Sequence, residues 1–198
     1  MKRGGAGAGR LRLSGGRHGG RVLAVPRDAR PTGGRVREAL FSIWGERVEG
    51  ARVLELFAGS GAVALEALGR GAAAATAVER DPRALAALAA NAERLGERAA
   101  LTVRRGALPA ELARLARRGA GPFDLAFADP PYRFTAWTEL LAGLAPLLAE
   151  DGEAVIEHSI RSVPPDEAAG LVRVDRRRYG ESALSFYRRD GAPSLDLR

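Results

Sequence analysis

Cysteine is absent from the 198 residues, and histidine occurs only twice, as His18 and His158. The chain therefore forms no disulfide, thiolate metal site or cysteine nucleophile, and we expect it to hold no metal. No uncharged apolar run approaches the roughly 18 residues that span a bilayer. The first 20 residues are basic and glycine-rich, without the apolar segment of a signal peptide. These absences argue against a secreted, membrane or zinc protein, and we expect a globular, cytoplasmic monomer.

Acidic residues are scarce near the N-terminus. Residues 1–50 hold eleven basic and four acidic residues and carry the whole formal net charge of +7, while the rest of the chain has twenty of each sign. A neutral body with a basic arm indicates a polyanion bound at one end. Apart from Lys2 the basic residues are arginines, whose planar guanidinium groups can bind phosphates and stack on bases. A merely solvated arm is the alternative. The candidate nucleic-acid-binding residues are Arg10, Arg12, Arg17, Arg21, Arg35 and Arg37.

The N-terminal segment divides into short pieces. Residues 1–9 are rich in glycine and alanine, and we expect them to be disordered. Two β-type runs, residues 10–13 and 21–25, surround a glycine-rich stretch and predict a hairpin. A loop follows, and a helix is expected from Thr32 or a nearby glycine to about Trp44. Residues 10–34 would form a basic hairpin and loop, residues 35–190 a catalytic domain, and residues 191–198 a tail.

From Arg52 onward, apolar runs alternate with helical patterns. The strand candidates lack polar alternation, which is typical of a parallel sheet covered by helices on both faces. We expect strands over 52–57, 76–79, 101–105, 123–128 and 153–158, and helices over 62–70, 82–95, 107–118 and 135–148. After Pro164 and Pro165 the pattern predicts a short helix and then a hairpin formed by residues 171–177 and 183–188.

A glycine-rich turn, Glu55 to Gly61, ends the first of these strands. Glycines allow a tight turn and the close approach of a ligand at the carboxyl end of a strand. Glu79 follows twenty residues after Gly59, at the spacing of a carboxylate that binds ribose hydroxyls. Ala64 replaces the third glycine of the dinucleotide fingerprint, and the acidic Glu55 suits a cationic amino acid group better than a pyrophosphate. A dinucleotide site and a purely structural turn remain the alternatives.

The sequence Asp129-Pro130-Pro131-Tyr132 directly follows a buried strand. It is therefore expected at the same edge of the sheet as Gly59. The prolines stiffen the loop, so that Asp129 and the Pro130 carbonyl can accept both N–H bonds of an exocyclic base amine. Tyr132 offers a ring on which an extracted base can stack. A simple proline turn with an aspartate cap is the alternative.

Together these motifs resemble the S-adenosylmethionine-dependent amino methyltransferases. The run from Arg30 to Phe41, with Gly15-Gly16 and Gly20-Arg21 before it, is similar to the RsmD family. This resemblance implies an α/β fold of the Rossmann-like class I type, with a seven-stranded, mostly parallel sheet and a small N-terminal β-hairpin. It also implies methylation of N2 of a guanine in 16S rRNA, within the 30S subunit or an assembly intermediate.

The resemblance also implies roles for individual residues. Glu55 to Gly61 would line the methionine end of the cofactor, Glu79 would hold its ribose, and Asp129 to Tyr132 would bind the guanine amine. The expected cofactor-binding residues are Glu55, Phe57, Ala58, Gly59, Ser60, Gly61, Glu79, Arg80, Gly106 and Ala107. Two departures from the family pattern are Arg105-Gly106-Ala107-Leu108, in the turn near the cofactor adenine, and Gly33-Gly34.

Other interpretations and residues stay open. The same Asp-Pro-Pro-Tyr motif would serve a DNA adenine-N6 methyltransferase, and two further classes are a nucleotide-dependent oxidoreductase and a non-catalytic RNA-binding protein. His158 is expected near the site, more as a structural than as a catalytic residue. Trp44 and Trp137 are expected in the core or an interface, and Asn91 near a helix end. The C-terminal arginines, among them Arg177, Arg178, Arg188 and Arg189, either extend the RNA surface or are solvated.

Overall fold

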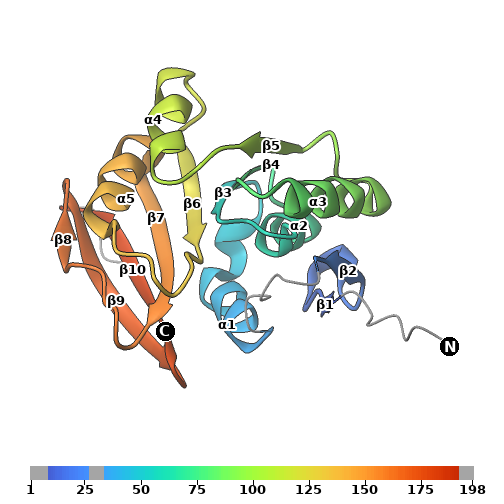
Figure 1. Ribbon diagram of the computed structural model, residues 1–198, viewed down its shortest axis with the longest axis horizontal. Helices are drawn as coiled ribbons and strands as arrows, with labels where there is room; N and C mark the ends of the chain where they lie inside the picture. Colours follow the sequence, from blue (N-terminus) through green and yellow to red (C-terminus); the bar gives the residue numbers. More distant parts are fainter. Residues whose placement is uncertain (1–8, 27–33, 192–198) are drawn as a thin grey trace, which may run out of the picture.

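The computed structural model describes residues 9–26 and 34–191. Its centre is an eight-stranded sheet in the order β5-β4-β3-β6-β7-β10-β9-β8, and a separate two-stranded sheet pairs β1 with β2 (Figure 1). The strands of the large sheet are β3 (Arg52–Leu56), β4 (Ala74–Glu79), β5 (Leu101–Arg105), β6 (Phe123–Ala128), β7 (Leu148–Ser159), β8 (Glu167–Ala168), β9 (Leu171–Tyr179) and β10 (Ser182–Arg189). The predicted α/β architecture is confirmed.

Four neighbouring strands of the sheet are aligned at one level near the ends of β3 and β6. Leu56 of β3 pairs with Val78 of β4 on one side and with Ala128 of β6 on the other, and Ala128 pairs with Ile156 of β7. All three pairings are parallel, so the four strands point the same way. The next residue of each strand therefore lies on one common edge. Those next residues are Phe57, Glu79, Asp129 and Glu157.

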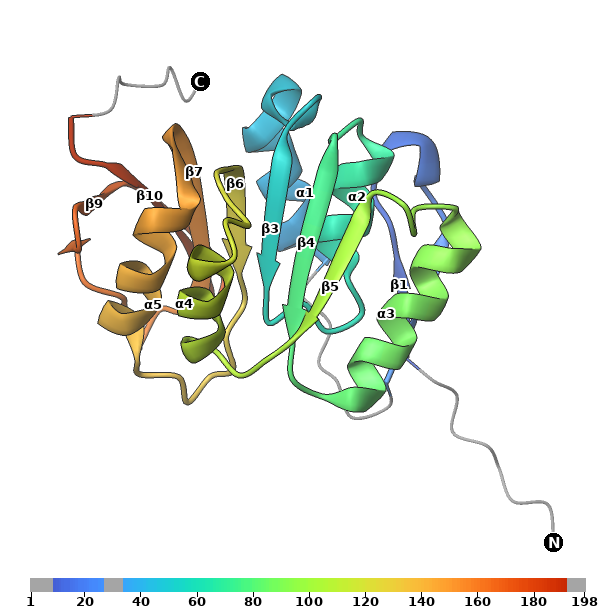
Figure 2. The same cartoon turned by 90° about the horizontal axis from the view of Figure 1, so that it is seen from above.

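Helices cover both faces of the sheet, as the apolar strands predicted. One face packs against α1 (Gly34–Trp44), α2 (Ala62–Gly69) and α3 (Pro82–Leu95), and the other against α4 (Ala110–Arg117) and α5 (Trp137–Leu144) (Figure 2). Successive strand residues point to opposite faces. Accordingly Val53 joins the first core, whereas Leu54 and Leu56 join the second.

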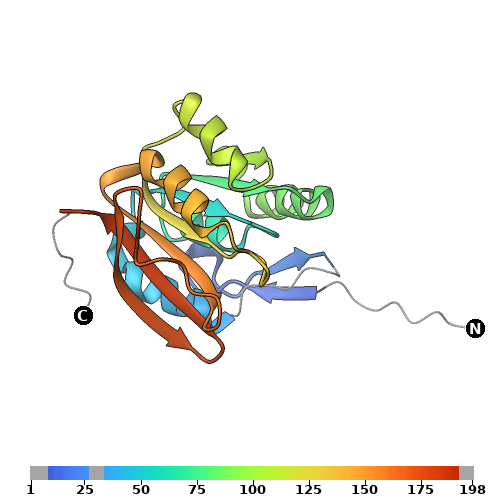
Figure 3. The same cartoon turned by 60° about the vertical axis from the view of Figure 1, so that its left-hand side comes forward.

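The predicted N-terminal hairpin is present, as β1 (Gly9–Arg12) and β2 (Val22–Val25) paired antiparallel. Its glycine-rich connection contains a short 3₁₀ helix, η1 (Gly16–His18). The hairpin lies beside α2 and α3, apart from the large sheet (Figures 1 and 3). Leu11, Leu23 and Val25 are buried in the first core. The basic hairpin is therefore packed onto the domain rather than detached from it.

The hairpin is fastened by a buried carboxylate, Glu66 of α2. Arg37 of α1 donates to it at 2.9 Å, Arg70 donates at 2.8 Å, and Ser14 donates through its backbone N–H at 3.0 Å and through its hydroxyl. The side chains of Glu66 and Arg37 are 0% and 2% exposed. Arg37 also donates to the backbone carbonyl of Arg12 in the hairpin at 2.5 Å. One anionic group thus joins three segments that are distant in the sequence.

Several predicted elements need correction. The sheet has eight strands instead of seven, because β8 pairs with β9 where a short helix was expected. Only a few residues separate Pro165 from the turn at Ala169 and Gly170, both with positive φ, which is too short for a stable helix. The helix expected from 107 begins at Ala110, after Pro109, and the one expected over 135–148 spans Trp137–Leu144 and continues as the 3₁₀ turn η3 (Ala145–Leu147).

The remaining N-terminal and terminal predictions have mixed outcomes. Gly9, expected to be disordered, begins β1. Three predictions fall outside the described residues. They are the disorder of residues 1–8, most of the loop over 26–34 and nearly all of the tail. The helix expected to end near Trp44 does so, and Trp44 is buried in the core. Among the described helices none is both long and apolar enough to cross a membrane.

Replacing Glu66 by glutamine should destabilise the fold. The change leaves the buried guanidinium of Arg37 without its counter-charge, and breaking a buried ion pair typically costs about 3–5 kcal/mol. Chemical denaturation measures the free energy of unfolding. The matched control is Glu93→Gln, because Glu93 and Arg98 form a 3.8 Å pair that is exposed on both sides. The control should change stability by less than about 1 kcal/mol, and equal losses in both variants would contradict the role of Glu66.

Candidate active site

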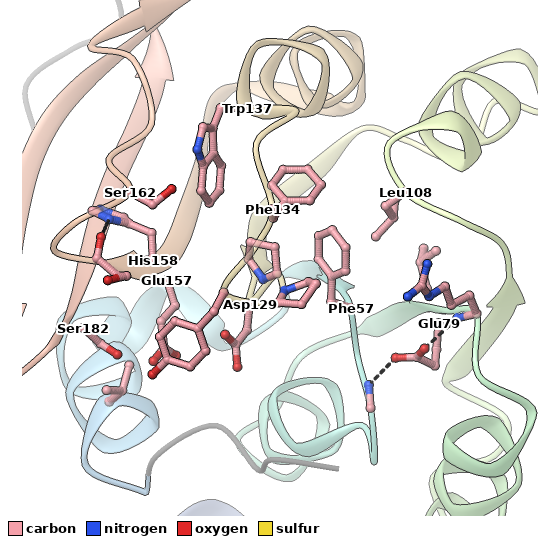
Figure 4. Close-up of a pocket in the computed structure, with 18 of the residues that line it drawn as sticks. Phe57, Glu79, Leu108, Asp129, Phe134, Trp137, Glu157, His158, Ser162 and Ser182 are labelled. Atoms are coloured by element: carbon pink, nitrogen blue, oxygen red, sulfur yellow. Dashed lines mark hydrogen bonds between the residues drawn. The ribbon is translucent and has the colours of Figure 1, made fainter. Parts of the chain in front are cut away.

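A cavity of about 740 Å³ opens at the common edge of the four strands (Figure 4). This volume lies within the range typical of small-molecule and cofactor sites. The cavity brings the two sequence motifs together from opposite sides of β3. Its lining contains these predicted residues: Phe57, Gly59, Glu79, Arg80, Gly106, Asp129, Pro130, Pro131 and Tyr132.

The turn between β3 and α2 is built on three residues with positive φ. Phe57 has φ 56°, Gly59 has φ 52° and Gly61 has φ 78°. A side chain on Gly61 would come within 2.9 Å of Leu88, so this glycine is needed for packing of α3. A side chain on Gly59 would meet nothing within 4 Å, because this glycine faces the cavity. The turn thus exposes backbone to a ligand, while Phe57 adopts a conformation that is unusual for a residue with a side chain.

Glu79 is held in a fixed orientation at the end of β4. One carboxylate oxygen accepts from the backbone N–H of Gly59 at 2.8 Å. The other accepts from the backbone N–H groups of Arg80 and Asp81 at 2.7 and 2.9 Å (Figure 4). Each carboxylate oxygen has two lone pairs, so the oxygen bonded to Gly59 can still accept from a ligand hydroxyl, whereas the other is already occupied by two N–H groups. The structure therefore presents Glu79 to the cavity as an oriented acceptor.

Glu55 does not line the cavity as expected. Its side chain is buried behind the turn, where its two oxygens accept from the N–H groups of Val63 and Ala64 at 3.0 and 2.9 Å. These are orphan donors at the start of α2, so Glu55 caps this helix. Burial raises the pKa of Glu55 to about 7, an effect that the nearby Asp129 reinforces and the two backbone hydrogen bonds oppose. Glu55 thus stabilises the turn and the start of α2 through these two hydrogen bonds.

Four more predicted cofactor residues lie outside the cavity lining, namely Ala58, Ser60, Gly61 and Ala107. The carbonyl of Ser60 accepts from the side-chain amide of Asn91 at 3.2 Å, and the Ala107 carbonyl accepts from the N–H of Glu111 at 3.0 Å. Gly106 does line the cavity, and its N–H donates to the carbonyl of Glu79 at 3.0 Å. These residues hold the backbone of the two turns that face the cavity.

Asp129 to Tyr132 form the loop that leaves β6. Pro130 is buried, and the Pro131 carbonyl accepts from the N–H of Phe134 at 2.8 Å, which closes a tight turn. Tyr132 is 52% exposed at the mouth of the cavity. The loop therefore places the carboxylate of Asp129 in the cavity lining and the ring of Tyr132 at the cavity entrance.

A row of aromatic side chains forms one wall of the cavity. The ring centroids of Phe57 and Phe134 are 5.4 Å apart, those of Phe134 and Trp137 4.9 Å, and those of Trp137 and His158 6.4 Å. All are arranged edge to face, the geometry that aromatic pairs favour. Sequence reasoning missed Phe134 and placed Trp137 in the core or an interface. Both residues follow the Asp-Pro-Pro-Tyr loop closely in the sequence, and this closeness could have predicted that they line the cavity.

His158 lies in the cavity wall as a fixed, neutral group. Its Nδ1 is 2.8 Å from the Ser159 carbonyl, which only accepts, so Nδ1 carries the proton. Nε2 is 2.8 Å from the Ser185 hydroxyl, from which it then accepts. Burial lowers the pKa of His158 below its ordinary value. With both nitrogens engaged, His158 fits the structural role expected of it.

The cavity extends further than the two motifs, toward the β9–β10 turn. This part is lined by residues that sequence reasoning did not assign to the site, namely Val36, Glu157, Ser159, Ser162, Tyr179, Glu181 and Ser182. They come from α1, from β7 and the loop that follows it, and from the β9–β10 hairpin. Nothing in their local sequence marks them, because only the strand order brings them beside Asp129.

The predicted RNA-binding arginines differ in their surroundings. Arg37 is 1% exposed and bound to Glu66, so its assignment to the RNA surface was wrong. Arg17 is exposed but paired with Glu97 at 2.5 Å, and Arg12 donates to the carbonyl of Gly20 at 2.6 Å. Arg10, Arg21 and Arg35 are exposed. Among the C-terminal arginines Arg188 is buried, and Arg189 donates to the carbonyls of Ala145 and Leu148.

The raised pKa of Glu55 gives a pH-dependent stability. Because the folded-state pKa of about 7 exceeds the ordinary 4.5, the folded protein holds this proton more tightly. The contribution is full below pH 4.5 and is lost as pH rises through 7. Between pH 5 and 8, the free energy of unfolding should therefore fall by roughly 2 to 3 kcal/mol more in the wild type than in Glu55→Gln. Urea denaturation at both pH values measures this, and a constant difference between the two proteins would contradict it.

Comparisons with known proteins agree with this architecture. Ribosomal RNA small subunit methyltransferase D of Escherichia coli (strain K12) is 34% identical over 203 residues, which cover 96% of each chain. A solved structure described as "Putative methyltransferase yhhF from Escherichia coli" superposes with a TM-score of 0.80 at 33% identity, over 93% of this chain and 100% of that one. The solved structure of a hypothetical protein from Thermus thermophilus gives a TM-score of 0.76 at 35% identity, over 89% and 98%.

These likenesses confirm the predicted Rossmann-like fold of class I S-adenosylmethionine-dependent methyltransferases. The family model described as Conserved hypothetical protein 95 matches residues 11–188. The match covers the hairpin, the glycine-rich turn and the Asp129 loop alike. The chain therefore belongs to this family, the RsmD family that its motifs indicated.

Proposed function

We propose that this chain transfers a methyl group from S-adenosylmethionine to the N2 amine of a guanine in 16S rRNA of the small ribosomal subunit. The observation that carries this proposal is the meeting of two motifs in one cavity. Glu79 and Gly59 present a ligand-binding turn on one side, and Asp129 to Tyr132 present an amine-binding loop on the other. The family relationship to a small-subunit rRNA methyltransferase supports the choice of substrate.

The half of the cavity around Glu79 fits the cofactor. The oxygen of Glu79 that accepts only from Gly59 can also accept from a ribose hydroxyl, and Gly59 leaves room for close approach to the backbone. Phe57 and Leu108 add apolar surface that suits an adenine ring. S-adenosylmethionine supplies an electrophilic methyl group on a positively charged sulfur. The carboxylates at this edge of the sheet favour a cationic ligand.

The half around Asp129 fits the amine. Asp129 and the Pro130 carbonyl would accept the two N–H bonds, which favours a pyramidal nitrogen with an exposed lone pair. Tyr132 would stack on the base once it has left the RNA helix. A strong general base is not needed, because the nitrogen becomes acidic as it is alkylated. This agrees with the neutral, doubly hydrogen-bonded state of His158.

The reaction is balanced by a simple exchange. One N–H bond of the amine would be replaced by an N–CH₃ bond. The C–S bond of the methyl donor would break, which leaves S-adenosylhomocysteine as the second product. The proton of the replaced N–H bond would be released separately. The chain contributes by holding the amine in line with the methyl group. Orientation of this kind supplies a large share of the rate acceleration in bimolecular reactions.

The exposed arginines of the hairpin and α1 would bind the RNA backbone. Arg10, Arg12, Arg21 and Arg35 are exposed, and the hairpin that carries the first three is packed on the domain. Its position is fixed relative to the cavity by the Glu66 and Asn91 contacts. A small basic surface of this kind suits recognition of folded RNA through its shape and phosphates.

Replacing Asp129 by alanine should strongly slow methyl transfer while leaving the affinity for S-adenosylmethionine nearly unchanged. The loss removes one acceptor of the amine, and we expect the rate to fall by roughly 100- to 1,000-fold. The assay transfers labelled methyl groups from S-adenosylmethionine to 30S subunits that lack the modification, followed by nucleoside analysis. Naked 16S rRNA and duplex DNA serve as parallel substrates. Calorimetric titration with S-adenosylmethionine measures the affinity.

The outcomes of this assay separate the candidate functions. Label in N2-methylguanosine supports the proposal, whereas label only in DNA adenine would keep the chemistry and change the substrate. Cofactor binding without transfer to any substrate would favour a non-catalytic RNA-binding protein. Full activity of the Asp129 variant would remove this residue from the reaction. An oxidoreductase is disfavoured because Ala64 replaces the third glycine and the Asp129 loop would have no role.

Glu79→Ala should weaken S-adenosylmethionine binding. Loss of an oriented charged acceptor costs about 1–3 kcal/mol, which is roughly a ten- to hundredfold increase in the dissociation constant. The matched control is Glu150→Ala, which removes an exposed carboxylate that does not line the cavity. An equal dissociation constant for the wild type and the Glu79 variant would exclude Glu79 from the cofactor site.

A further inference from the structure

The carboxylate of Glu157 lies in the substrate half of the cavity, beside the amine-binding loop. Ala128 of β6 pairs in parallel register with Ile156 of β7, so Asp129 and Glu157 are the next residues on adjacent strands. Adjacent strands are about 4.8 Å apart. Both residues line the cavity, and Figure 4 shows them near each other below the aromatic wall. The sheet therefore places two carboxylates side by side where the base would enter.

Glu157 is held more firmly than a loop residue. It belongs to β7, which is hydrogen-bonded to β6 on one side and to β10 on the other, where Leu184 is its partner. The next residue, His158, is fixed by its contacts with Ser159 and Ser185. Glu157 is only 8% exposed. A side chain on such a supported strand can define the position of a ligand atom, as recognition requires.

Carboxylates gather at this edge of the sheet, among them Asp129 and Glu157. Glu55 lies behind the turn, close enough to Asp129 for the two charges to influence each other. Like charges in a partly buried site oppose each other's ionisation. Hydrogen-bond donors and positive charge would relieve this repulsion. The site is therefore suited to a substrate that presents several N–H groups in a row.

Guanine has this arrangement on its Watson–Crick edge. The two N–H bonds of its N2 amine are followed directly by the N1–H. Adenine has an amine beside N1 as well, but its N1 carries a lone pair and only accepts. A carboxylate next to the amine-binding site therefore attracts guanine and repels adenine. The carboxylate also repels 2-aminopurine, which keeps the amine at C2 but lacks the proton on N1.

We propose that Glu157 accepts the N1–H of the target guanine and thereby selects guanine over bases whose N1 is an acceptor. This inference rests on the proposed function and adds to it the residue that determines the base. Asp129 holds the reacting amine, and Glu157 reads the neighbouring ring nitrogen. Glu157 is thus a specificity-determining residue that contacts the base without touching the reacting atoms.

The test compares two substrates that differ at the edge facing Glu157. Once the modified position is known, 16S rRNA is prepared by splinted ligation with either guanosine or 2-aminopurine ribonucleoside there and reconstituted into 30S subunits. The measured quantity is the ratio of kcat/KM for the two substrates. The wild type should prefer guanine by roughly ten- to hundredfold, because 2-aminopurine leaves the buried carboxylate without its donor.

Glu157→Gln should bring this ratio to within about threefold of one, since an amide can donate to the N1 of 2-aminopurine and accept from that of guanine. Glu157→Asp keeps the charge and should retain the guanine preference at a lower rate. The matched control is Glu181→Gln, which neutralises another cavity carboxylate, 69% exposed on its side chain, and should keep the wild-type ratio. Affinity for S-adenosylmethionine and thermal melting verify that each variant is folded.

The outcomes distinguish this inference from the proposed function. A Glu157→Gln variant that keeps the wild-type preference overturns the inference, while methylation of guanine by the wild type still supports the function. An equal fall in rate on both substrates overturns it as well, because that pattern indicates a structural role. A wild type that methylates neither substrate removes the function and the inference together.

Discussion

The site depends on the alignment of four parallel strands. Because β4, β3, β6 and β7 are paired at one level, the residues that follow Val78, Leu56, Ala128 and Ile156 emerge on a single edge. Hydrogen bonding fixes this alignment across the whole sheet, and a shift of one strand by one residue would turn its side chain to the other face. The backbone alignment thus brings Phe57, Glu79, Asp129 and Glu157 close together.

This alignment places acidic groups together, and the surrounding structure offsets the cost in different ways. Glu79 accepts three backbone N–H groups, which stabilise its charge. Glu55 accepts two, yet its burial raises its pKa to about 7, so that it exchanges its proton near neutral pH. The negative character that remains at the edge matches a cationic methyl donor and a base rich in N–H groups.

Sequence reasoning found those parts of the fold that are encoded locally. The apolar strands, the start of α3 at Pro82, the Gly59–Gly61 turn and the Asp129 loop all have short-range patterns, and each lies close to its predicted position. Sequence reasoning failed for residues whose surroundings are set by contacts between distant parts of the chain. Arg37 resembles any other arginine of the basic arm until its buried contact with Glu66 is known, and Glu157 becomes a neighbour of Asp129 only through the strand order. Glu55 was misplaced because its motif does not reveal which way the side chain points.

The same long-range contacts link the basic hairpin to the cofactor turn. The side chain of Asn91 on α3 pairs with both backbone groups of Ala24 in β2, at 2.9 and 3.0 Å, and also donates to the carbonyl of Ser60 in the turn. Glu66 makes a second contact with the hairpin, in which its carboxylate accepts from the backbone N–H of Ser14. An amide and a carboxylate, both fully buried, thus join the hairpin to the segment that follows β3. Since buried polar contacts of this kind are strongly directional, the hairpin is positioned as part of the domain. An RNA held by its arginines would meet the cavity in one fixed orientation.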